Sequence, residues 1–248
     1  MGKDLSVDEV RIRLRGMADA DKAAVLRGFF KTGAGEYGEG DKFLGITVPK
    51  LRRLASACKG AGEEFALAFL SSEFHEERLF ALLILTGIYK HAGDDGRERV
   101  YEKYLANTSR INNWDLVDIS APHIVGAHLE KRPRRRLYEL AGSRSLWKRR
   151  IAIVATLHFI RQNDPADTLE IARVLLSDKE DLIHKAAGWM LREAGKRDLA
   201  ALRAFLERHA PSMPRTMLRY SIERFPPDER MFWLRQRMKD PGPRPSPG

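Results

Sequence analysis

The residues with the clearest chemical potential lie in one short stretch, 112–118, which reads Asn-Asn-Trp-Asp-Leu-Val-Asp. In a helix, Trp114 and Asp118 are four positions apart, so they stand on one face, one turn from each other. The face of a tryptophan ring attracts cations, and a carboxylate stabilises positive charge that develops in a cavity. The pair therefore favours a site that holds a cationic ligand, or one that stabilises an oxocarbenium ion and orients a water molecule.

Each residue of this stretch also has a structural interpretation. A tryptophan in a helix is usually a core residue. Asp115 can cap local backbone groups, and Asp118 can be a structural carboxylate that bonds the next helix. The stretch alone leaves both interpretations open.

Two later stretches, 147–150 and 185–192, also contain a tryptophan, in these cases together with basic residues. Arg150 follows Trp114 by 36 residues, and Trp189 follows Arg150 by 39. One unit of a helical repeat occupies roughly 30–47 residues, and positions one period apart lie side by side on a repeat surface. The residues that this spacing predicts to form one site are Trp114, Asp118, Arg150 and Trp189.

The charge of the chain indicates an anionic partner. The formal net charge is +10 and the pI is about 9.8, which favours nucleic acid or an acidic membrane surface. Between Lys131 and Arg161 there are ten Lys and Arg residues against one acid, Glu139. A one-signed block of this length predicts a phosphate-binding surface rather than a solvated helix of mixed charge.

Within and after this block, the residues next to the tryptophans are the candidates for DNA contact. Arg150 is favoured for a bidentate contact with a phosphate, although the adjacent Arg149 and Lys148 compete for that role. Lys185 and Arg192 lie four residues before and three after Trp189, so they share its helix face and fit backbone phosphates.

Several other classes of site are not supported by the sequence. The histidines show no metal-binding spacing, so no metal or cofactor is expected. The single cysteine, Cys58, excludes an internal disulfide framework and is expected in the core. The glycine-rich stretch 32–41 lacks the Gly-Lys-Ser/Thr ending of a nucleotide-binding loop and is expected to be a flexible loop. The longest apolar run is far too short to span a membrane, so no membrane partner is expected. The use of a single cysteine fits the reducing cytoplasm, and we expect a cytoplasmic monomer with no obligate protein partner.

Apolar residues recur at spacings of three and four throughout, which predicts an all-α protein of about fourteen short helices. Ser6 and Glu9 form a capping-box pattern at the first helix, and Pro122 is expected to bend or interrupt a helix over 113–129. We predict a right-handed α-solenoid of HEAT-like repeats with a concave basic surface, one domain over 1–239, and a disordered Pro/Gly-rich tail over 240–248. The later helices are expected at 133–141, 145–161, 165–176, 179–193, 198–209, 214–225 and 227–239.

At these residues the sequence resembles the AlkD family of DNA alkylation-repair glycosylases, which are built from HEAT-like repeats. The matching motifs are Phe-Leu-Gly-Ile followed by Pro at 43–49, Trp-Asp-x-x-Asp at 114–118, Trp-x-x-Arg at 147–150, and Lys-Ala-x-Gly-Trp-x-Leu-Arg-Glu at 185–193. The resemblance covers roughly residues 8–235. The glycine-rich stretch 32–41 departs from the family as an insertion, and Phe29 and Phe30 stand where a tyrosine is expected.

The resemblance implies hydrolysis of the N-glycosidic bond of cationic N3- and N7-alkylated purines in duplex DNA, by a monofunctional enzyme without a base-binding pocket. Asp118 would stabilise the oxocarbenium-like sugar and position water, Trp114 and Trp189 would line the sugar side of the cleft, and Arg150 would hold a phosphate. Two alternatives stay open: a non-catalytic binder of distorted or branched DNA, and a protein-interaction solenoid.

Overall fold

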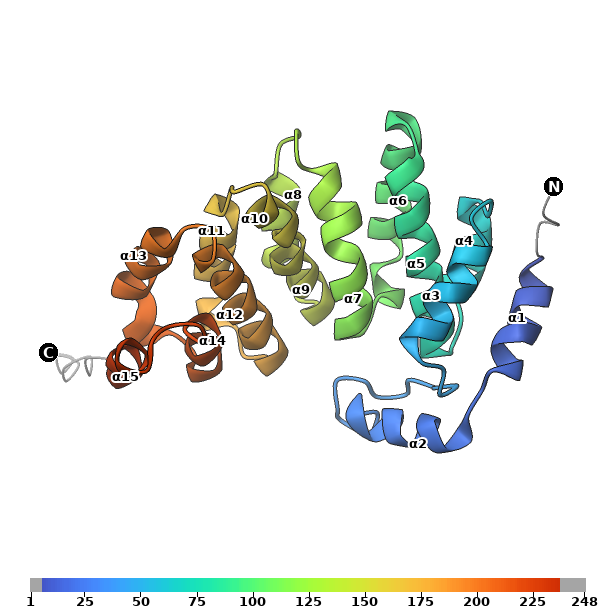
Figure 1. Ribbon diagram of the computed structural model, residues 1–248, viewed down its shortest axis with the longest axis horizontal. Coiled ribbons are helices and arrows are strands. Elements are labelled where there is room, and N and C mark those ends of the chain that lie inside the picture. Colours follow the sequence, from blue (N-terminus) through green and yellow to red (C-terminus); the bar gives the residue numbers. More distant parts are fainter. Residues whose placement is uncertain (1–5, 237–248) are drawn as a thin grey trace, which may run out of the picture. The chain divides into compact units, whose positions relative to one another are not determined.

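The computed structural model describes residues 6–236, and its regular elements are all helical (Figure 1). Among these residues, strand-like pairing is limited to one isolated bridge between Lys42 and Phe74. The all-α class is therefore confirmed. The chain divides between Lys131 and Arg132 into two compact units, which are described separately. The predicted tail at 240–248 lies outside the described residues, and the single domain over 1–239 stays a prediction.

The first named element of unit 1 is a capped helix, and its last is a π-helical turn. Ser6 and Glu9 close the capping box that the sequence predicts. Its elements are α1 (Val7–Gly16), α2 (Ala20–Phe29), α3 (Val48–Ala57), α4 (Glu63–Leu70), α5 (His75–His91), α6 (Asp94–Ala106), η1 (Thr108–Arg110), α7 (Trp114–Ala121) and η2 (Pro122–Gly126).

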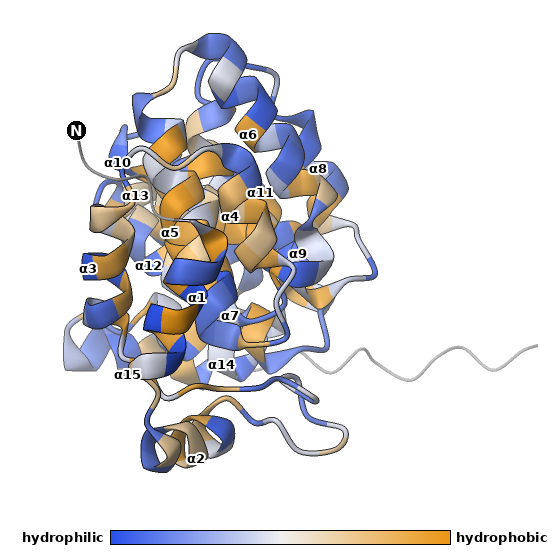
Figure 2. Ribbon diagram, turned by 90° about the vertical axis from the view of Figure 1, so that its right-hand side faces the viewer, coloured by the Kyte–Doolittle hydropathy of each residue, from blue (hydrophilic) through white to orange (hydrophobic). Residues whose placement is uncertain are grey.

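Helix α5 is the centre of unit 1. It packs against α4, α3, α6 and α7, and its residues from Leu79 to Leu82 are almost fully buried. Figure 2 shows apolar residues concentrated on α4 and α5. The first four residues of α5, 75–78, are charged or polar and yet buried as well. Buried polar groups need hydrogen-bond partners, so this first turn must be supplied with them from elsewhere in the unit.

Pro122 interrupts the helix at 113–129 as predicted. Helix α7 ends at Ala121, and the chain continues through a π-helical turn, Pro122–Gly126. Proline lacks the N–H that an α-helix needs at this position, which forces the wider turn. The interruption leaves α7 as a short segment whose start carries Trp114 and whose middle carries Asp118.

Unit 2 contains helices that pack as sequence neighbours: α8 with α9, α11 with α12, and α12 with α13. Such pairing of consecutive helices is the arrangement from which helical repeats are built. The elements are α8 (Arg135–Ala141), α9 (Leu146–Ala155), α10 (Leu157–Arg161), α11 (Ala166–Val174), η3 (Leu175–Ser177), α12 (Asp181–Gly195), α13 (Leu199–His209), η4 (Ala210–Ser212), α14 (Arg215–Ser221) and α15 (Pro227–Arg235).

The prediction of one helix over 145–161 was wrong at a single point. The structure breaks it at Thr156, between α9 and α10. The Thr156 hydroxyl donates a hydrogen bond of 2.6 Å to the carbonyl of Ile153, a side-chain bond that competes with the helical ladder. The apolar periodicity continues across the break, so hydrophobic spacing alone did not reveal it.

Gly188 allows α12 to approach α14 closely. A Cβ atom at this position would lie 2.5 Å from both the carbonyl oxygen of Met217 and the Cβ of Tyr220. These are a backbone atom and the root of a side chain, so the two helices would have to move apart. This close contact explains why a glycine, an unfavourable helix residue, stands immediately before Trp189.

We expect Gly188→Ala to destabilise unit 2 by about 1–3 kcal/mol, because the added methyl group overpacks the helix interface. Gly87→Ala is the matched control, since Gly87 also lies inside a helix but has nothing within 4 Å of the added Cβ. The control should be neutral or stabilising by about 0.5–1 kcal/mol. Urea unfolding of both variants measures the difference, and equal midpoints would contradict the packing argument.

Candidate functional site

The start of α7 fixes the position of Trp114. Asn113 is fully buried, and its side-chain oxygen accepts a hydrogen bond of 2.8 Å from the Trp114 backbone N–H. The Trp114 ring stacks on Phe30, with centroids 5.3 Å apart and planes 18° apart, and meets the edge of Phe29 at 6.0 Å. The indole is half-buried. Trp114 is therefore packed in the core on one side, as the structural interpretation expects. The rest of its ring is partly exposed and can contact a ligand.

Asp118 lies one helical turn after Trp114 and is also half-buried. Its charge acts on Tyr104, whose hydroxyl is 2.9 Å from the Ser120 hydroxyl. Burial raises the pKa of Tyr104, and the negative charge of Asp118 raises it further. Tyr104 is thus a neutral phenol at physiological pH.

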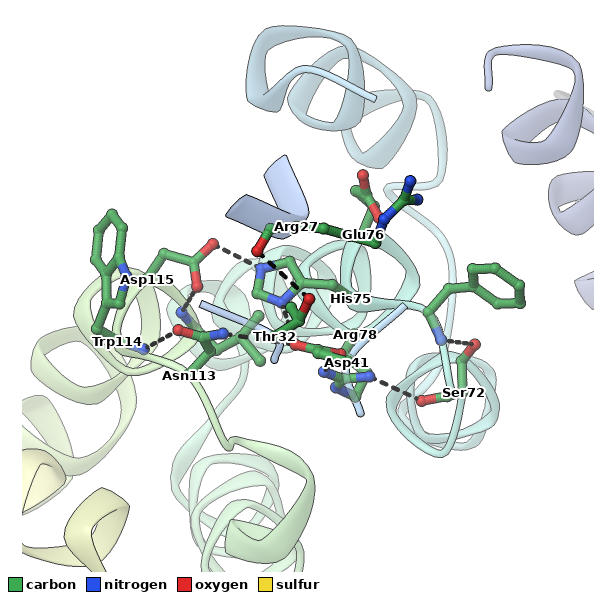
Figure 3. Close-up of polar contacts among 12 residues, drawn as sticks. Arg27, Thr32, Asp41, Ser72, His75, Glu76, Arg78, Asn113, Trp114 and Asp115 are labelled. Atoms are coloured by element: carbon green, nitrogen blue, oxygen red, sulfur yellow. Dashed lines mark hydrogen bonds and ion pairs between the residues drawn. The ribbon is translucent and has the colours of Figure 1, made fainter. Parts of the chain in front are cut away.

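A buried polar network surrounds the first turn of α5 (Figure 3). His75 Nε2 lies 2.8 Å from Asp115 Oδ2, and His75 Nδ1 lies 2.9 Å from Asp41 Oδ2. Arg78 Nη2 donates to the other oxygen of Asp41 at 2.6 Å, and Asn113 Nδ2 donates to Asp41 at 3.5 Å. These bonds join three segments that are far apart in the sequence: the end of the glycine-rich stretch, α5 and α7.

The carboxylates govern the charge of His75. Burial by itself lowers the pKa of this histidine, but its hydrogen bonds to Asp115 and Asp41 outweigh burial and raise the pKa to about 9. The pKa of Asp41 lies below its usual value. Burial alone would raise this pKa, but the hydrogen bonds and positive charges of His75 and Arg78 lower it by more. At neutral pH the network is therefore a buried imidazolium between two carboxylates, with Arg78 as a second cation.

Glu76 organises the neighbouring turn. Its Oε2 accepts a hydrogen bond of 2.9 Å from the backbone N–H of Leu44, and its Oε1 accepts from Gly45 at 2.7 Å and Ile46 at 3.2 Å. Gly45 has φ +82°, and an added Cβ would lie 2.0 Å from the Asp19 carbonyl oxygen. Only glycine fits this turn, which explains the Leu-Gly-Ile motif physically.

An apolar cavity of about 230 Å³ opens beside this network. Phe30 and Phe43 stack on each other at 5.0 Å, and both rings contact the His75 ring, at 4.9 and 4.6 Å. The cavity is lined by Lys22, Val25, Leu26, Phe30, Phe43, Gly45, Ile46, Thr47, Val48, His75, Glu76, Leu79 and Asp115.

In unit 2, the predicted phosphate ligand Arg150 is mostly buried. It is 5% exposed, and its Nη1 donates a hydrogen bond of 2.7 Å to the carbonyl of Leu182. This contact connects α9 to the first turn of α12. Arg150 can therefore present only a small part of its guanidinium to solvent.

The other predicted DNA-contact residues of unit 2 differ in their surroundings. Arg149 pairs with Asp178 at 2.6 Å, Lys185 with Asp181 at 2.8 Å, and Arg192 with Glu223 and Glu193. Lys148 is half-buried on the first turn of α9. Most of these cations are thus already partly neutralised by carboxylates in the same unit.

In the folded structure, carboxylates lie next to several of the basic residues in the block 131–161. Arg134 pairs with Asp164 and Asp167, and it also covers the ring of Phe159 at 3.8 Å. Arg135 and Arg136 share Glu139. Acids that follow the block in the sequence fold back onto it, which the linear charge count could not show.

Trp189 is half-buried on α12 and lines an open cavity of about 320 Å³. Arg161, Lys196 and Arg197 line the same cavity, together with one acid, Glu193. Trp189 is therefore the part of unit 2 at which an aromatic face and several cations meet. The sequence analysis had singled out none of these three cations individually.

The comparison with known families decides the class of protein. The family model described as "DNA alkylation repair enzyme" matches residues 10–225. The chain belongs to this family. A solved structure titled "Predicted DNA alkylation repair enzyme from Enterococcus faecalis" is similar over 84% of this chain and 97% of that one, with a TM-score of 0.65 and 15% identity, so it shares the fold. No curated protein matches the chain.

Membership in the DNA alkylation repair enzyme family confirms the predicted resemblance and a role in DNA alkylation repair. The family match includes the stretches that carry Trp114, Asp118, Arg150 and Trp189. Trp114 and Asp118 share a helix face in unit 1, while Arg150 and Trp189 lie on adjacent helices of unit 2. That the four residues form one site stays a prediction.

The network residues Asp41, His75, Glu76 and Arg78 were missed in the sequence analysis. The available signal was the run His-Glu-Glu-Arg at 75–78, immediately before the apolar run of a helix whose residues 75–82 are all buried. Four polar residues at the start of such a helix must each find a partner. Within residues 6–236, no group of three or more His, Cys, Asp or Glu residues is arranged so that it could hold a metal ion, and no helix there is long and apolar enough to cross a membrane.

Proposed function

We propose that this DNA alkylation repair enzyme is an N-glycosylase for cationic N3- and N7-alkylated purines in duplex DNA. The observation that supports this activity best is the arrangement on α7, where the half-buried carboxyl group of Asp118 lies one turn from the half-buried Trp114. A cation fits between an aromatic face and a carboxylate. Both the alkylated base and the sugar in the transition state are cationic.

The chemistry requires little from the protein. Alkylation places a positive charge on the purine. When the bond between C1′ and the base nitrogen breaks, the bonding electrons stay on the base, and the base leaves as a neutral molecule. The sugar becomes oxocarbenium-like, and Asp118 stabilises that charge electrostatically. Asp118 also orients the water that adds to C1′, and the proton that this water loses passes to solvent. A strong general acid is not needed for so good a leaving group.

The DNA contacts are proposed to come from both units. Trp114 and Trp189 would lie along the sugar–phosphate backbone near the lesion, and Lys148, Arg149, Lys185 and Arg192 would contact phosphates. Arg149, Lys185 and Arg192 are held by carboxylates, so they meet DNA as oriented ion pairs rather than mobile cations. Arg150, whose Nη1 donates to the Leu182 carbonyl, is proposed to contact a phosphate through the small part of its side chain that reaches solvent.

The direct test is release of free base from duplex DNA that carries N7-methylguanine, compared with the same duplex without the lesion. The proposal expects release from the alkylated duplex only, with a rate that falls as salt weakens the phosphate contacts. Tight binding to duplex DNA with no release from any alkylated substrate would contradict the glycosylase. It would instead support a repair protein that binds DNA without excising bases.

A further inference from the structure

The Asp41–His75–Asp115 network has a geometry that core packing alone does not require. His75 is 2% exposed, and each of its ring nitrogens faces a carboxylate oxygen at 2.8–2.9 Å. The two carboxylates come from segments 34 residues before and 40 residues after it. Burying charged groups is costly unless their geometry is good, so a core with no other task would be expected to use apolar residues here.

We propose that His75 is a positioning residue: with Asp41 and Asp115 it fixes the first turn of α7, and so the directions of Trp114 and Asp118. The proposal rests on the function proposed above for those last two residues. It assigns His75 no contact with DNA, base or water.

Three routes connect His75 to the start of α7 and to Trp114. Through hydrogen bonds, His75 holds Asp115, which follows Trp114 directly and accepts from the Leu116 backbone N–H at 2.9 Å. Through rings, His75 contacts Phe30 at 4.9 Å, and Phe30 stacks on Trp114 at 5.3 Å. Asp41 adds a third link, because Asn113, the residue that caps α7, donates to it.

The network works only while His75 carries both ring protons. A neutral imidazole has a single N–H, so one nitrogen lone pair would face a carboxylate at less than 3 Å. The imidazolium donates to both. The charged groups around the ring are Asp41 from the glycine-rich stretch, Asp115 from α7, Glu76 and Arg78 from α5, and Lys22 from α2 at the shared cavity. The raised pKa of His75, about 9, agrees with this arrangement.

The first readout is spectroscopic and does not depend on activity. Nitrogen-15 NMR of the His75 ring and of the Trp114 indole N–H, followed from neutral to alkaline pH, should show His75 losing a proton near pH 9. The Trp114 resonance should shift with the same midpoint, because the first turn of α7 loosens as the proton leaves. A neutral His75 ring at pH 7, or a Trp114 signal that does not follow His75, would overturn the proposal.

The second readout is the single-turnover rate of N7-methylguanine release by His75→Gln. Glutamine can donate to one carboxylate only, so the rate should fall by about 10- to 100-fold, the loss expected from a misplaced catalytic group. Duplex affinity should change little. His91→Gln, an exposed histidine at the other end of α5, is the matched control and should behave as wild type. An unchanged rate in His75→Gln, or an equal loss of rate and affinity, would overturn the proposal.

Asp115→Asn is the second variant, in case His75→Gln does not fold. The amide oxygen can still accept from His75 Nε2, but the charge that holds the proton is gone, so the pH midpoint of the Trp114 signal should move down. An unmoved midpoint would contradict the network. If the wild type releases no base at all, the proposed function fails, whereas the coupled titration of His75 and Trp114 still decides the positioning role.

Discussion

Replacement of Asp118 by asparagine is expected to lower the rate of base release from alkylated duplex DNA by about 100-fold or more, while the affinity for that duplex changes little. Asparagine has nearly the same size and can occupy the same half-buried place on α7. It lacks the charge that opposes the positive charge developing on the sugar. The loss should therefore appear in the rate of the chemical step rather than in binding.

Single-turnover kinetics with saturating enzyme separate these quantities. Asp95→Asn is a matched control, because Asp95 is an exposed carboxylate of unit 1 in the first turn of α6. It removes the same charge from the unit as a whole, so any general electrostatic effect on DNA binding appears in both variants. If Asp118→Asn lost rate and affinity in equal measure, Asp118 would be a binding residue and not the stabiliser of the transition state.

The helices were largely predictable because each combines apolar periodicity with a local start or stop signal. Ser6 and Glu9 marked the first helix, and Pro122 marked the interruption after α7. Thr156 shows the limit of this approach. Its break depends on one side-chain hydroxyl that bonds its own backbone, and nothing in the apolar spacing reports such a bond.

The candidate site was only partly predictable. Trp114 and Asp118 are four residues apart, so helical geometry alone places them on one face. The partners of His75, by contrast, lie 34 and 40 residues away, and such pairings arise from tertiary packing rather than local sequence. The same reason explains the basic block: Asp178, which neutralises Arg149, is 29 residues further along the chain.

The largest effect on stability is expected from Glu76→Ala. Glu76 is 2% exposed and accepts from three consecutive backbone N–H groups, those of Leu44, Gly45 and Ile46. Alanine leaves all three donors without their acceptor, and each buried donor that loses its partner costs about 1–3 kcal/mol. Water that enters the adjoining apolar cavity can satisfy some of them. We therefore expect unit 1 to lose about 3–6 kcal/mol, a large part of the stability of a typical domain.

Glu73→Ala is the matched control for this substitution. Glu73 lies in the connection before α5 and makes one exposed ion pair, with Lys42 at 2.7 Å. Exposed pairs contribute about 0–1 kcal/mol, so this variant should unfold close to wild type. Urea unfolding of the two variants measures the difference, and similar midpoints would show that the Leu-Gly-Ile turn holds its shape without Glu76. A loss of stability in Glu76→Ala alone would instead show that the turn and α5 unfold as one cooperative unit. The backbone N–H of Asp19 donates to the carbonyl of Leu44 at 2.8 Å, so the start of α2 depends on the same carboxylate.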